Sequence, residues 1–404
     1  MLRHRHMTRR DFLLRTAAAT VAAPLVMNAR AFGANDQITM GCIGMGGQGR
    51  GDMGGFMGFQ QVRVVAICDV VKGNREGAKG QVDGRYGNTD CAACTDFREV
   101  ISRPDIDAVL VATPDHWHAT IAVEAMKHGK DVYCEKPETL TIREGRVMVE
   151  TARRYGRVFS GGSQRVWGDY NWFHRMIWGG GIGEVQEAWV DCGGPSEDCY
   201  LPEEPVPAGL DWDMWLGPAP WAPFNHGRLN FRPWREYSGG QMTDWGAHNF
   251  GGALFAMRLH ETGPVEVIPP NGKDNPLLTY VFANGIRVHH QGGWGGAMSF
   301  RGTDGEIPER GGKKLRKDPP SNVFIPNYKG EGGIFGDFLH CVRTRQRPFR
   351  DIEIAHRTVS VCHLGNLAYW LKRPLKWDPV KEQIIGDAEA SRWLDRPKRA
   401  PWRL

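Results

Sequence analysis

The chain has 404 residues, a length that indicates more than one domain. Hydrophobic residues make up 41% and charged residues 24%, a composition typical of globular proteins. Its formal net charge is +5, but six arginines and only one acid, Asp11, fall within residues 1–34. The remainder is therefore close to neutral, which argues against nucleic acid as a partner.

Residues 1–34 have the pattern of a twin-arginine export signal. Arg9 and Arg10 are followed by Asp11, Phe12 and two leucines, then by an alanine-rich apolar stretch and small residues suited to cleavage. The apolar stretch is shorter than the ~20 residues that a membrane-spanning helix needs, so we expect no stable membrane span. The segment predicts export, to the periplasm or otherwise out of the cytoplasm.

From residue 36 to 160, short apolar runs alternate with helical stretches. The helical pattern covers 118–128 and 141–155, and the strand-like runs are Ile38–Ile43, Val62–Cys68, Ala108–Ala112, Asp131–Cys134 and Val158–Gly161. Strands joined by right-handed helical crossovers form a parallel sheet covered by helices. We therefore predict an α/β Rossmann domain over residues 36–160.

Residues 161–404 differ in composition, because glycine, proline and tryptophan are frequent there. Alternating segments predict strands at Val185–Val190, Leu278–Phe282 and Ile286–Gln291, and two helices follow at Phe335–Thr344 and Ile354–Leu371. This pattern predicts an α+β domain with a largely antiparallel open sheet. Because such a sheet has one uncovered face, we also expect a homo-oligomer, either a dimer or a tetramer.

The spacing of the nine cysteines does not indicate a disulfide framework. Cys42, Cys68 and Cys134 lie in or beside apolar runs and are predicted to be buried thiols. Cys91 and Cys94 form the only CxxC pattern, and no second CxxC or histidine pair has zinc-like spacing, so we expect no metal site. The sequence does not decide whether a disulfide joins Cys91 to Cys94 or Cys192 to Cys199.

A glycine-rich turn follows the first strand and opens the first helix. It consists of Gly44, Met45, Gly46, Gly47, Gln48 and Gly49. Glycines in this pattern allow a tight turn, close approach of a pyrophosphate and close helix–strand packing, and the helix N-terminus attracts phosphate. Asp69 ends the second strand, where a carboxylate would accept hydrogen bonds from ribose hydroxyls and repel a 2′-phosphate. The motif predicts bound NAD, with NADP possible because Lys72 lies nearby.

Two further motifs follow later strands, at the edge of the sheet where ligands bind in this architecture. The first contains Thr113, Pro114 and His118, and the second is Glu135-Lys136-Pro137. We expect these residues to face the cofactor and Lys136 to be catalytic, although a single lysine after a strand is more often a surface charge.

The third motif contains Asp244 and His248, four residues apart, which places them on one face of a predicted helix. The carboxylate could orient the imidazole, and both could contact a substrate hydroxyl. A helix cap and a packed histidine explain the pair equally well. Other substrate-site candidates beside these motifs, for which ordinary packing is also a sufficient explanation, are Gln164, Arg165, Trp167, Tyr237 and Trp245.

In this order, the glycine-rich turn, Glu135-Lys136-Pro137 and Asp244-x-x-x-His248 resemble the Gfo/Idh/MocA oxidoreductases. Segments 209–220 and 237–240 resemble its twin-arginine-exported bacterial branch. The resemblance implies oxidation of a secondary hydroxyl on a sugar, glycoside or polyol by tightly held NAD(P). Lys136 would bind the nicotinamide ribose and the reacting hydroxyl, His248 would be the general base, and Asp244 would hold the substrate.

Members of that branch usually have a second histidine and an aspartate where this chain has Asn249 and Gly251, a difference that bears on substrate contacts. Two other functions fit the same motifs. One is a redox-assisted glycosidase or lyase, in which transient oxidation of the sugar permits cleavage. The other is a non-catalytic sugar-binding protein of the same fold.

Overall fold

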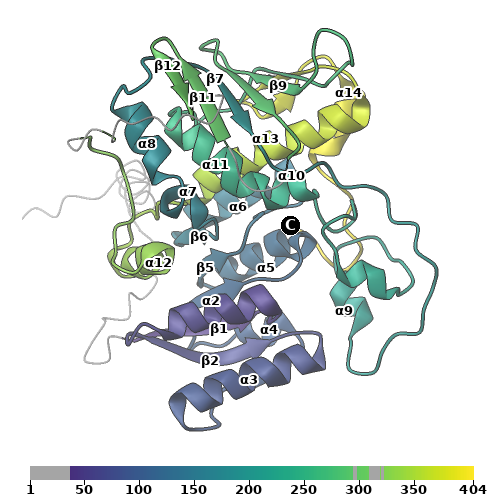
Figure 1. Ribbon diagram of the computed structural model, residues 1–404. Coiled ribbons are helices and arrows are strands. Elements are labelled where there is room, and N and C mark those ends of the chain that lie inside the picture. Colours follow the sequence, from purple (N-terminus) through teal and green to yellow (C-terminus); the bar gives the residue numbers. More distant parts are fainter. Residues whose placement is uncertain (1–36, 294–297, 309–318, 320–322) are drawn as a thin grey trace, which may run out of the picture. The chain divides into compact units, whose positions relative to one another are not determined.

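The computed structural model describes residues 37–293, 298–308, 319 and 323–404, and these residues form two β-sheets (Figure 1). The predicted export signal at 1–34 lies outside the described residues. Within the described part of the chain, no helix is long and apolar enough to cross a membrane.

The first sheet has six parallel strands in the spatial order β3-β2-β1-β4-β5-β6. Their bounds are β1 (Ile38–Ile43), β2 (Val62–Cys68), β3 (Ala92–Cys94), β4 (Ala108–Val111), β5 (Asp131–Cys134) and β6 (Phe159–Gly161). This order is that of doubly wound dinucleotide-binding sheets, and it confirms the predicted Rossmann class. Every residue of β4 and β5 is buried, which explains why β4 is an unbroken apolar run and why Asp131, the one charged residue of β5, is paired with Arg345.

Helices connect these strands and cover both faces of the sheet. They are α2 (Gly47–Met57), α3 (Lys72–Tyr86), α4 (Phe97–Ile101), α5 (Asp115–Lys127) and α6 (Ile142–Tyr155). Helix α6 begins at a capping box, in which the Thr141 hydroxyl accepts from the Glu144 amide and the Glu144 carboxylate accepts from the Thr141 amide. It ends at Gly156, whose φ of +61° suits a residue without a side chain.

The second sheet has the order β12-β11-β7-β10-β9-β8-β13-β14, and its named pairings are antiparallel except for the parallel pair β7–β10. The bounds are β7 (Val185–Val190), β8 (Glu266–Ile268), β9 (Leu278–Val281), β10 (Arg287–His290), β11 (Met298–Gly302), β12 (Gly305–Ile307), β13 (Leu375–Asp378) and β14 (Gln383–Ile384). The largely antiparallel sheet predicted for this half of the chain is confirmed.

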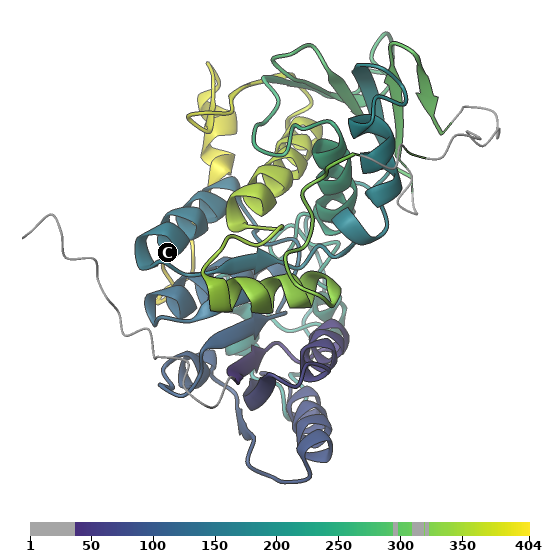
Figure 2. The same cartoon turned by 90° about the vertical axis from the view of Figure 1, so that its left-hand side faces the viewer.

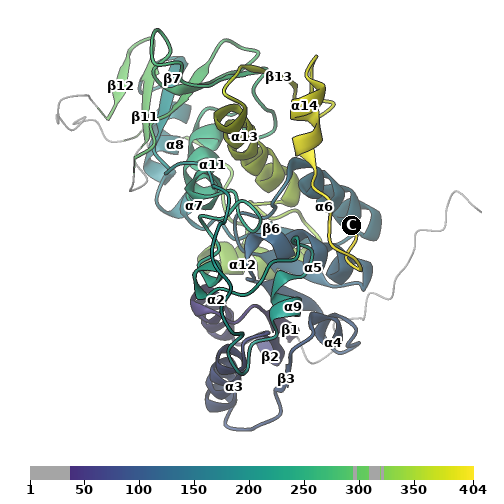
Figure 3. The ribbon, with the colours of Figure 1, turned by 90° about the vertical axis from the view of Figure 1, so that its right-hand side faces the viewer.

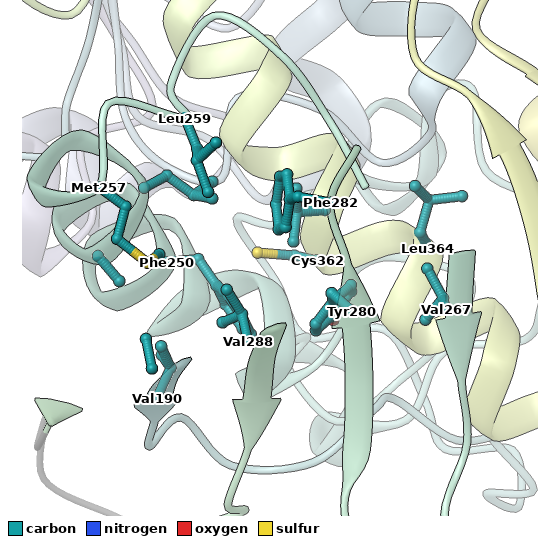
Figure 4. Close-up of a cluster of buried hydrophobic side chains, with 14 of the residues drawn as sticks. Val190, Phe250, Met257, Leu259, Val267, Tyr280, Phe282, Val288, Cys362 and Leu364 are labelled. Atoms are coloured by element: carbon teal, nitrogen blue, oxygen red, sulfur yellow. The ribbon is translucent and has the colours of Figure 1, made fainter. Parts of the chain in front are cut away.

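One face of the second sheet packs on α11 (Gly246–Ala256) and α13 (Ile352–Leu371). Figure 4 shows Phe250 and Cys362 of these helices directed toward Tyr280 and Val288 of the sheet. The shorter helices of this half are α7 (Arg165–Gly168), α8 (Asn171–Trp178), α9 (Trp212–Leu216), η1 (His226–Leu229), α10 (Gln241–Asp244), α14 (Ala388–Ser391) and η2 (Arg392–Leu394).

Helix α12 (Gly333–Thr344) comes late in the chain but belongs to the core of the first sheet. Its Phe335 and Phe338 meet Phe56 of α2 with ring centroids 4.7 and 5.9 Å apart. In Figure 2 the green helix α12 lies beside the purple helix α2. The sequence predicted this helix but not its place. The division predicted between 36–160 and 161–404 stays a prediction, because the sheets change at Gly161 while α12 packs on the earlier one.

A second late segment, residues 209–232, passes over the first sheet at the end of β2, and we call it the crossing segment. Leu210 forms a β-bridge with Val71, and the Lys72 amide donates to the Gly209 carbonyl at 2.8 Å. Helix α9 follows directly, and in Figure 3 it lies in front of the first sheet. The Trp117 indole N–H of α5 donates to the carbonyls of Met214 and Trp215 in α9, at 3.0 and 3.1 Å. This segment therefore stands over the edge of the sheet where the sequence motifs lie.

Close contact between α2 and the turn before it gives a first prediction. A methyl group at Gly49 would overlap the carbonyl oxygen of Gly44, whereas Gly51 in the same helix is exposed with nothing near it. Gly49→Ala should cost about 1–3 kcal/mol because the helix must move away from the strand. Gly51→Ala, the matched control, should stabilise by about 0.5–1 kcal/mol because alanine favours the helix.

Thermal unfolding followed by calorimetry measures both variants. If the two alanines shift the unfolding midpoint equally, close packing at Gly49 does not constrain the turn.

Candidate active site

A cavity of about 450 Å³ lies at the carboxyl ends of β1, β2, β4 and β5. Its walls include the glycine-rich turn, Asp69, Thr113, Pro114, Glu135 and Lys136 from the first sheet. The crossing segment closes another side with Met214, Trp215, Leu229, Phe231 and Arg232. Ligands of parallel sheets bind at this edge, at the point where the strand order reverses between β1 and β4.

The glycine-rich turn leaves room where a ligand needs it. Gly44 has φ +85° and lies against the backbone of Thr113, while nothing lies within 4 Å of a side-chain position at Gly46 or Gly47. Helix α2 begins at Gly47, so its first amides point toward the cavity. An anionic group can therefore approach the backbone closely, as the motif predicted.

Asp69 lies in the cavity wall at the end of β2 and holds the turn in place. Its carboxylate accepts from the amides of Met45 at 2.6 Å and Val71 at 2.7 Å. Burial raises the pKa of this carboxyl, against the effect of those two hydrogen bonds. A ribose hydroxyl at this site would share the carboxylate with the backbone.

Lys136 extends from the end of β5 and pairs with Asp244, the last residue of α10. The Lys136 Nζ lies 2.6 Å from Asp244 Oδ1, and Arg232 Nε lies 3.2 Å from the same oxygen. Burial alone would raise the pKa of the Asp244 carboxyl, but the two cationic neighbours outweigh it and hold the pKa below its usual value. Asp244 therefore stays ionised and fixes both cations at the cavity wall.

His248 lies in the first turn of α11 and is 4% exposed. Its Nδ1 is 2.7 Å from the hydroxyl oxygen of Ser163, whose proton is directed to the Ala247 carbonyl at 3.3 Å. Ser163 therefore orients the ring through Nδ1, and in the tautomer whose Nδ1–H donates to Ser163 the lone pair lies on Nε2. Burial, together with the nearby charge of Lys136, lowers the pKa of His248 well below its usual value. The ring is thus a neutral base at neutral pH.

The predicted pairing of Asp244 with His248 on one helix is wrong. Helix α10 ends at Asp244 and α11 begins at Gly246, so Trp245 separates the two elements. The carboxylate turns to Lys136 and Arg232 because two cations attract it more strongly than a neutral imidazole does. Ser163, not Asp244, orients His248.

The predicted cofactor residue His118 is a structural link. It is buried, with Nδ1 2.8 Å from the Pro137 carbonyl and Nε2 2.7 Å from the Thr113 carbonyl. Burial lowers the pKa of His118 to about 4, so the neutral ring has one N–H and donates to one of these carbonyls. His118 packs between the two motif loops and is not among the residues that line the cavity. Glu135, in contrast, lines the cavity, and burial raises its pKa well above the usual value.

The predicted substrate residues separate into two groups. Arg165 stacks over the Trp245 ring at 5.0 Å, and Trp245 meets His248 edge-on at 6.0 Å, while Gln164 is exposed directly before Arg165. Trp245 and Arg165 therefore lie near His248.

Tyr237 and Trp167 belong to the second group. Tyr237 is fully buried, accepts from Arg228 at 3.0 Å and packs on Trp215, so it cannot touch a substrate. Trp167 stacks on His174, with centroids 5.9 Å apart, and belongs to a hydrophobic cluster. Aromatic residues beside a motif are packed here into cores that the motif cannot reveal.

Sequence reasoning missed two charged residues of the cavity wall. Asp115 follows Thr113-Pro114 directly and accepts from the Ser238 hydroxyl at 2.6 Å, and burial raises its pKa to about 7. Its place in the motif was a signal that could have identified it. Arg232 lies in the crossing segment with no motif around it, so only the fold brings it to Asp244.

This arrangement combines a dinucleotide-binding sheet, a base and a fixed lysine, which defines the class of NAD-binding oxidoreductases. Two family models match the chain: "Oxidoreductase family, NAD-binding Rossmann fold" over residues 38–163 and "Oxidoreductase family, C-terminal alpha/beta domain" over residues 194–404. The chain belongs to the Gfo/Idh/MocA oxidoreductase family.

Individual relatives are more distant. A glycosyl hydrolase family 109 protein of Shewanella baltica is 33% identical over 178 residues, which cover 36% of this chain and 37% of the relative. Myo-inositol 2-dehydrogenase from Lactobacillus plantarum matches in structure with a TM-score of 0.59 and 17% identity, covering 84% of this chain and 99% of that one. Aldose-aldose oxidoreductase from Caulobacter crescentus, complexed with glycerol, matches with a TM-score of 0.59 and 18% identity, covering 84% of this chain and 99% of that one. The two structures establish the shared fold.

The ion pair at the cavity wall gives a second prediction. Asp244→Asn should destabilise the protein by about 1–3 kcal/mol at pH 7, because Lys136 and Arg232 lose the carboxylate that they share. The pKa of Asp244 is depressed in the folded state, so its contribution is complete above the ordinary value of 3.8 and is lost as the pH falls through the folded value. The deficit should therefore shrink below about pH 4.

Thermal unfolding of both proteins at pH 7 and pH 3 measures that deficit. Asp90→Asn is the control, because its partner Arg63 is 3.9 Å away and Asp90 is largely exposed. A deficit that stays constant with pH, or equals that of the control, contradicts the assignment.

Proposed function

We propose that the protein is an NAD-dependent oxidoreductase that acts on a secondary hydroxyl of a sugar, glycoside or polyol. The observation that carries the proposal is the placement of Lys136 and the neutral base His248 at the carboxyl edge of a dinucleotide-binding sheet. Structural neighbours named as a myo-inositol dehydrogenase and an aldose-aldose oxidoreductase support this substrate class.

The cavity fits a dinucleotide. Its volume lies in the range of about 300–1,000 Å³ that small-molecule and cofactor sites have. Two buried polar atoms of its lining residues, Thr113 Oγ1 and Glu135 Oε1, have no hydrogen-bond partner among the described residues, and a bound ligand would supply one. The turn from Gly44 to Gly49 would hold the pyrophosphate, and Asp69 the adenosine ribose. When bound, NAD supplies the acceptor for the hydride that leaves the substrate carbon.

The side chains of the chain would handle the proton. His248 Nε2 would accept the hydroxyl proton, in the tautomer whose Nδ1–H donates to Ser163. Lys136 would hold the hydroxyl oxygen and stabilise negative charge on it, while Asp244 keeps the ammonium group in position. Arg165 and Trp245, beside His248, would contact the rest of the sugar.

A redox-assisted glycosidase or lyase is a second candidate. The identity to a glycosyl hydrolase family 109 protein over 36% of this chain favours it. Asp115, with a pKa of about 7 in the same cavity, could supply a proton to a departing oxygen. Release of the glycosidic group without net NADH would support this function, whereas a keto-sugar with an intact glycosidic bond would support the dehydrogenase.

We further propose export by the twin-arginine route, from the pattern at residues 1–34, and a homo-oligomer formed through the second sheet. The twin-arginine route carries folded proteins, so a cofactor could be bound before export. Tight retention of NAD would then let one substrate reduce the cofactor that another has oxidised.

Turnover tests the catalytic assignment. Lys136→Met and His248→Gln should each lower kcat by about 10²–10⁴-fold, because one loses the cation and the other the base. The acidic limb of the pH profile of kcat/KM should lie below 6.5, since burial lowers the pKa of His248 and keeps it neutral there. Mass analysis of co-purified nucleotide, then a screen of sugars for keto products, provides the assay.

Lys127→Met and His226→Gln, at exposed positions, are the matched controls and should retain full activity. Normal turnover of either site variant would refute the assignment. A protein that carries no nucleotide and binds neither NAD nor NADP would instead favour a non-catalytic sugar-binding role.

Cofactor choice gives a further prediction. Asp69→Ser should reduce the preference for NAD over NADP by about tenfold, because a carboxylate that repels the 2′-phosphate is removed. Fluorescence titration with both dinucleotides gives the ratio of affinities, in which a general loosening of the turn cancels. Glu76→Gln, an exposed acid on α3, is the control and should leave the ratio unchanged. An unchanged ratio in Asp69→Ser would mean that the residue only supports the turn.

A further inference from the structure

Cys68 and Cys94 are direct partners in the sheet. They are the last residues of the parallel strands β2 and β3, and the register pairs Ala66 with Ala92, Ile67 with Ala93 and Cys68 with Cys94. Neighbouring strands lie about 4.8 Å apart, which falls within the range of Cα separations that a disulfide spans. The two residues lie outside every motif that the sequence analysis assigned to the cofactor or substrate.

The two side chains also lie on the same face of the sheet. Both belong to the hydrophobic cluster under α4 and α5, in which Cys68 is buried and Cys94 half-buried. Each thiol donates to a backbone carbonyl beside the other, Cys68 to Thr95 at 3.3 Å and Cys94 to Ile67 at 3.5 Å. Cys91 packs in the cluster on the opposite face, because residues three apart along an extended chain point to opposite sides. The CxxC pattern is therefore not a pair in space.

The pair is reachable by a reagent. Strand β3 is the edge strand of the sheet, and Cys94 is its last residue. Cys68 lines the 450 Å³ cavity beside Asp69 and Thr95. The other close thiols, Cys192 and Cys362, are both buried in the core of the second sheet, where no reagent can enter without unfolding.

The two thiols also differ in acidity. The neighbouring Cys68 thiol lowers the pKa of Cys94, whereas the neighbouring Cys94 thiol, with burial, raises the pKa of Cys68. An accessible thiol that ionises first, next to a buried one, is the arrangement of an attacking and a resolving cysteine.

We propose that Cys68 and Cys94 form a redox-active dithiol that closes to a disulfide at the wall of the cofactor cavity. The oxidant is a low-molecular-weight disulfide. The Cys94 thiolate attacks one of its sulfurs, which forms a mixed disulfide and releases one small thiol. The Cys68 thiolate then attacks Cys94 Sγ and releases the second small thiol. Two protons and two electrons thus pass from the protein to the reagent.

Disulfide mapping of the reduced full-length chain after exposure to oxidised glutathione under native conditions tests the proposal. Remaining thiols are alkylated, and the chain is digested without reduction and analysed by mass spectrometry. We expect a peptide linked through Cys68 and Cys94 and a loss of two hydrogens from the chain. The measurement needs no substrate, so it is independent of the proposed activity.

Two variants complete the test. Cys91→Ser should form the same bond, whereas Cys94→Ser should leave Cys68 reduced, with both variants checked for folding by circular dichroism. A Cys91–Cys94 link, a stable glutathione adduct on Cys94 with Cys68 free, or an unmodified pair in the folded wild-type chain would each overturn the proposal.

Discussion

The contact on which the site depends is the ion pair between Lys136 and Asp244. It joins the end of β5 in the first sheet to the end of α10, 108 residues later in the chain. Both side chains are largely buried, so each charge needs an opposite charge beside it. Asp244 also holds Arg232 of the crossing segment, and its position fixes the start of α11, which carries His248. One carboxylate thus sets the positions of a lysine, an arginine and a base.

Hydrogen bonds between uncharged groups also hold the residues of this site in place. His118 is buried between the carbonyls of Thr113 and Pro137, donates to one of them and packs the two loops that follow β4 and β5 against each other. Ser163 bonds to Nδ1 of His248, which sets the orientation of the ring and leaves Nε2 free of that contact. These groups do not need to touch a ligand to matter, because the distance between the lysine and the base depends on them.

How far the sequence predicts this structure differs between its parts. The bounds of β1, β2, β5 and β7 were predicted to the residue, because their hydrophobic residues are continuous or alternate as burial requires. Strand β3 was missed, since Ala92 and Ala93 carry no strand signal and the strand forms through its neighbour. Helix α12 was predicted as a helix, but its packing on the first sheet depends on long-range contacts with Phe56 and Tyr133.

The sequence by itself determined the parallel sheet, the glycine-rich turn and the position of Lys136 at a strand end, because these features follow from local periodicity and from the geometry of glycine. Only the tertiary structure decided the partners. Asp244 binds Lys136 and Arg232 rather than His248, Tyr237 and Trp167 enter packed clusters, and Cys94 meets Cys68 rather than Cys91. Periodicity fixes the face on which a side chain lies, whereas its partner comes from a distant segment that the fold alone brings near.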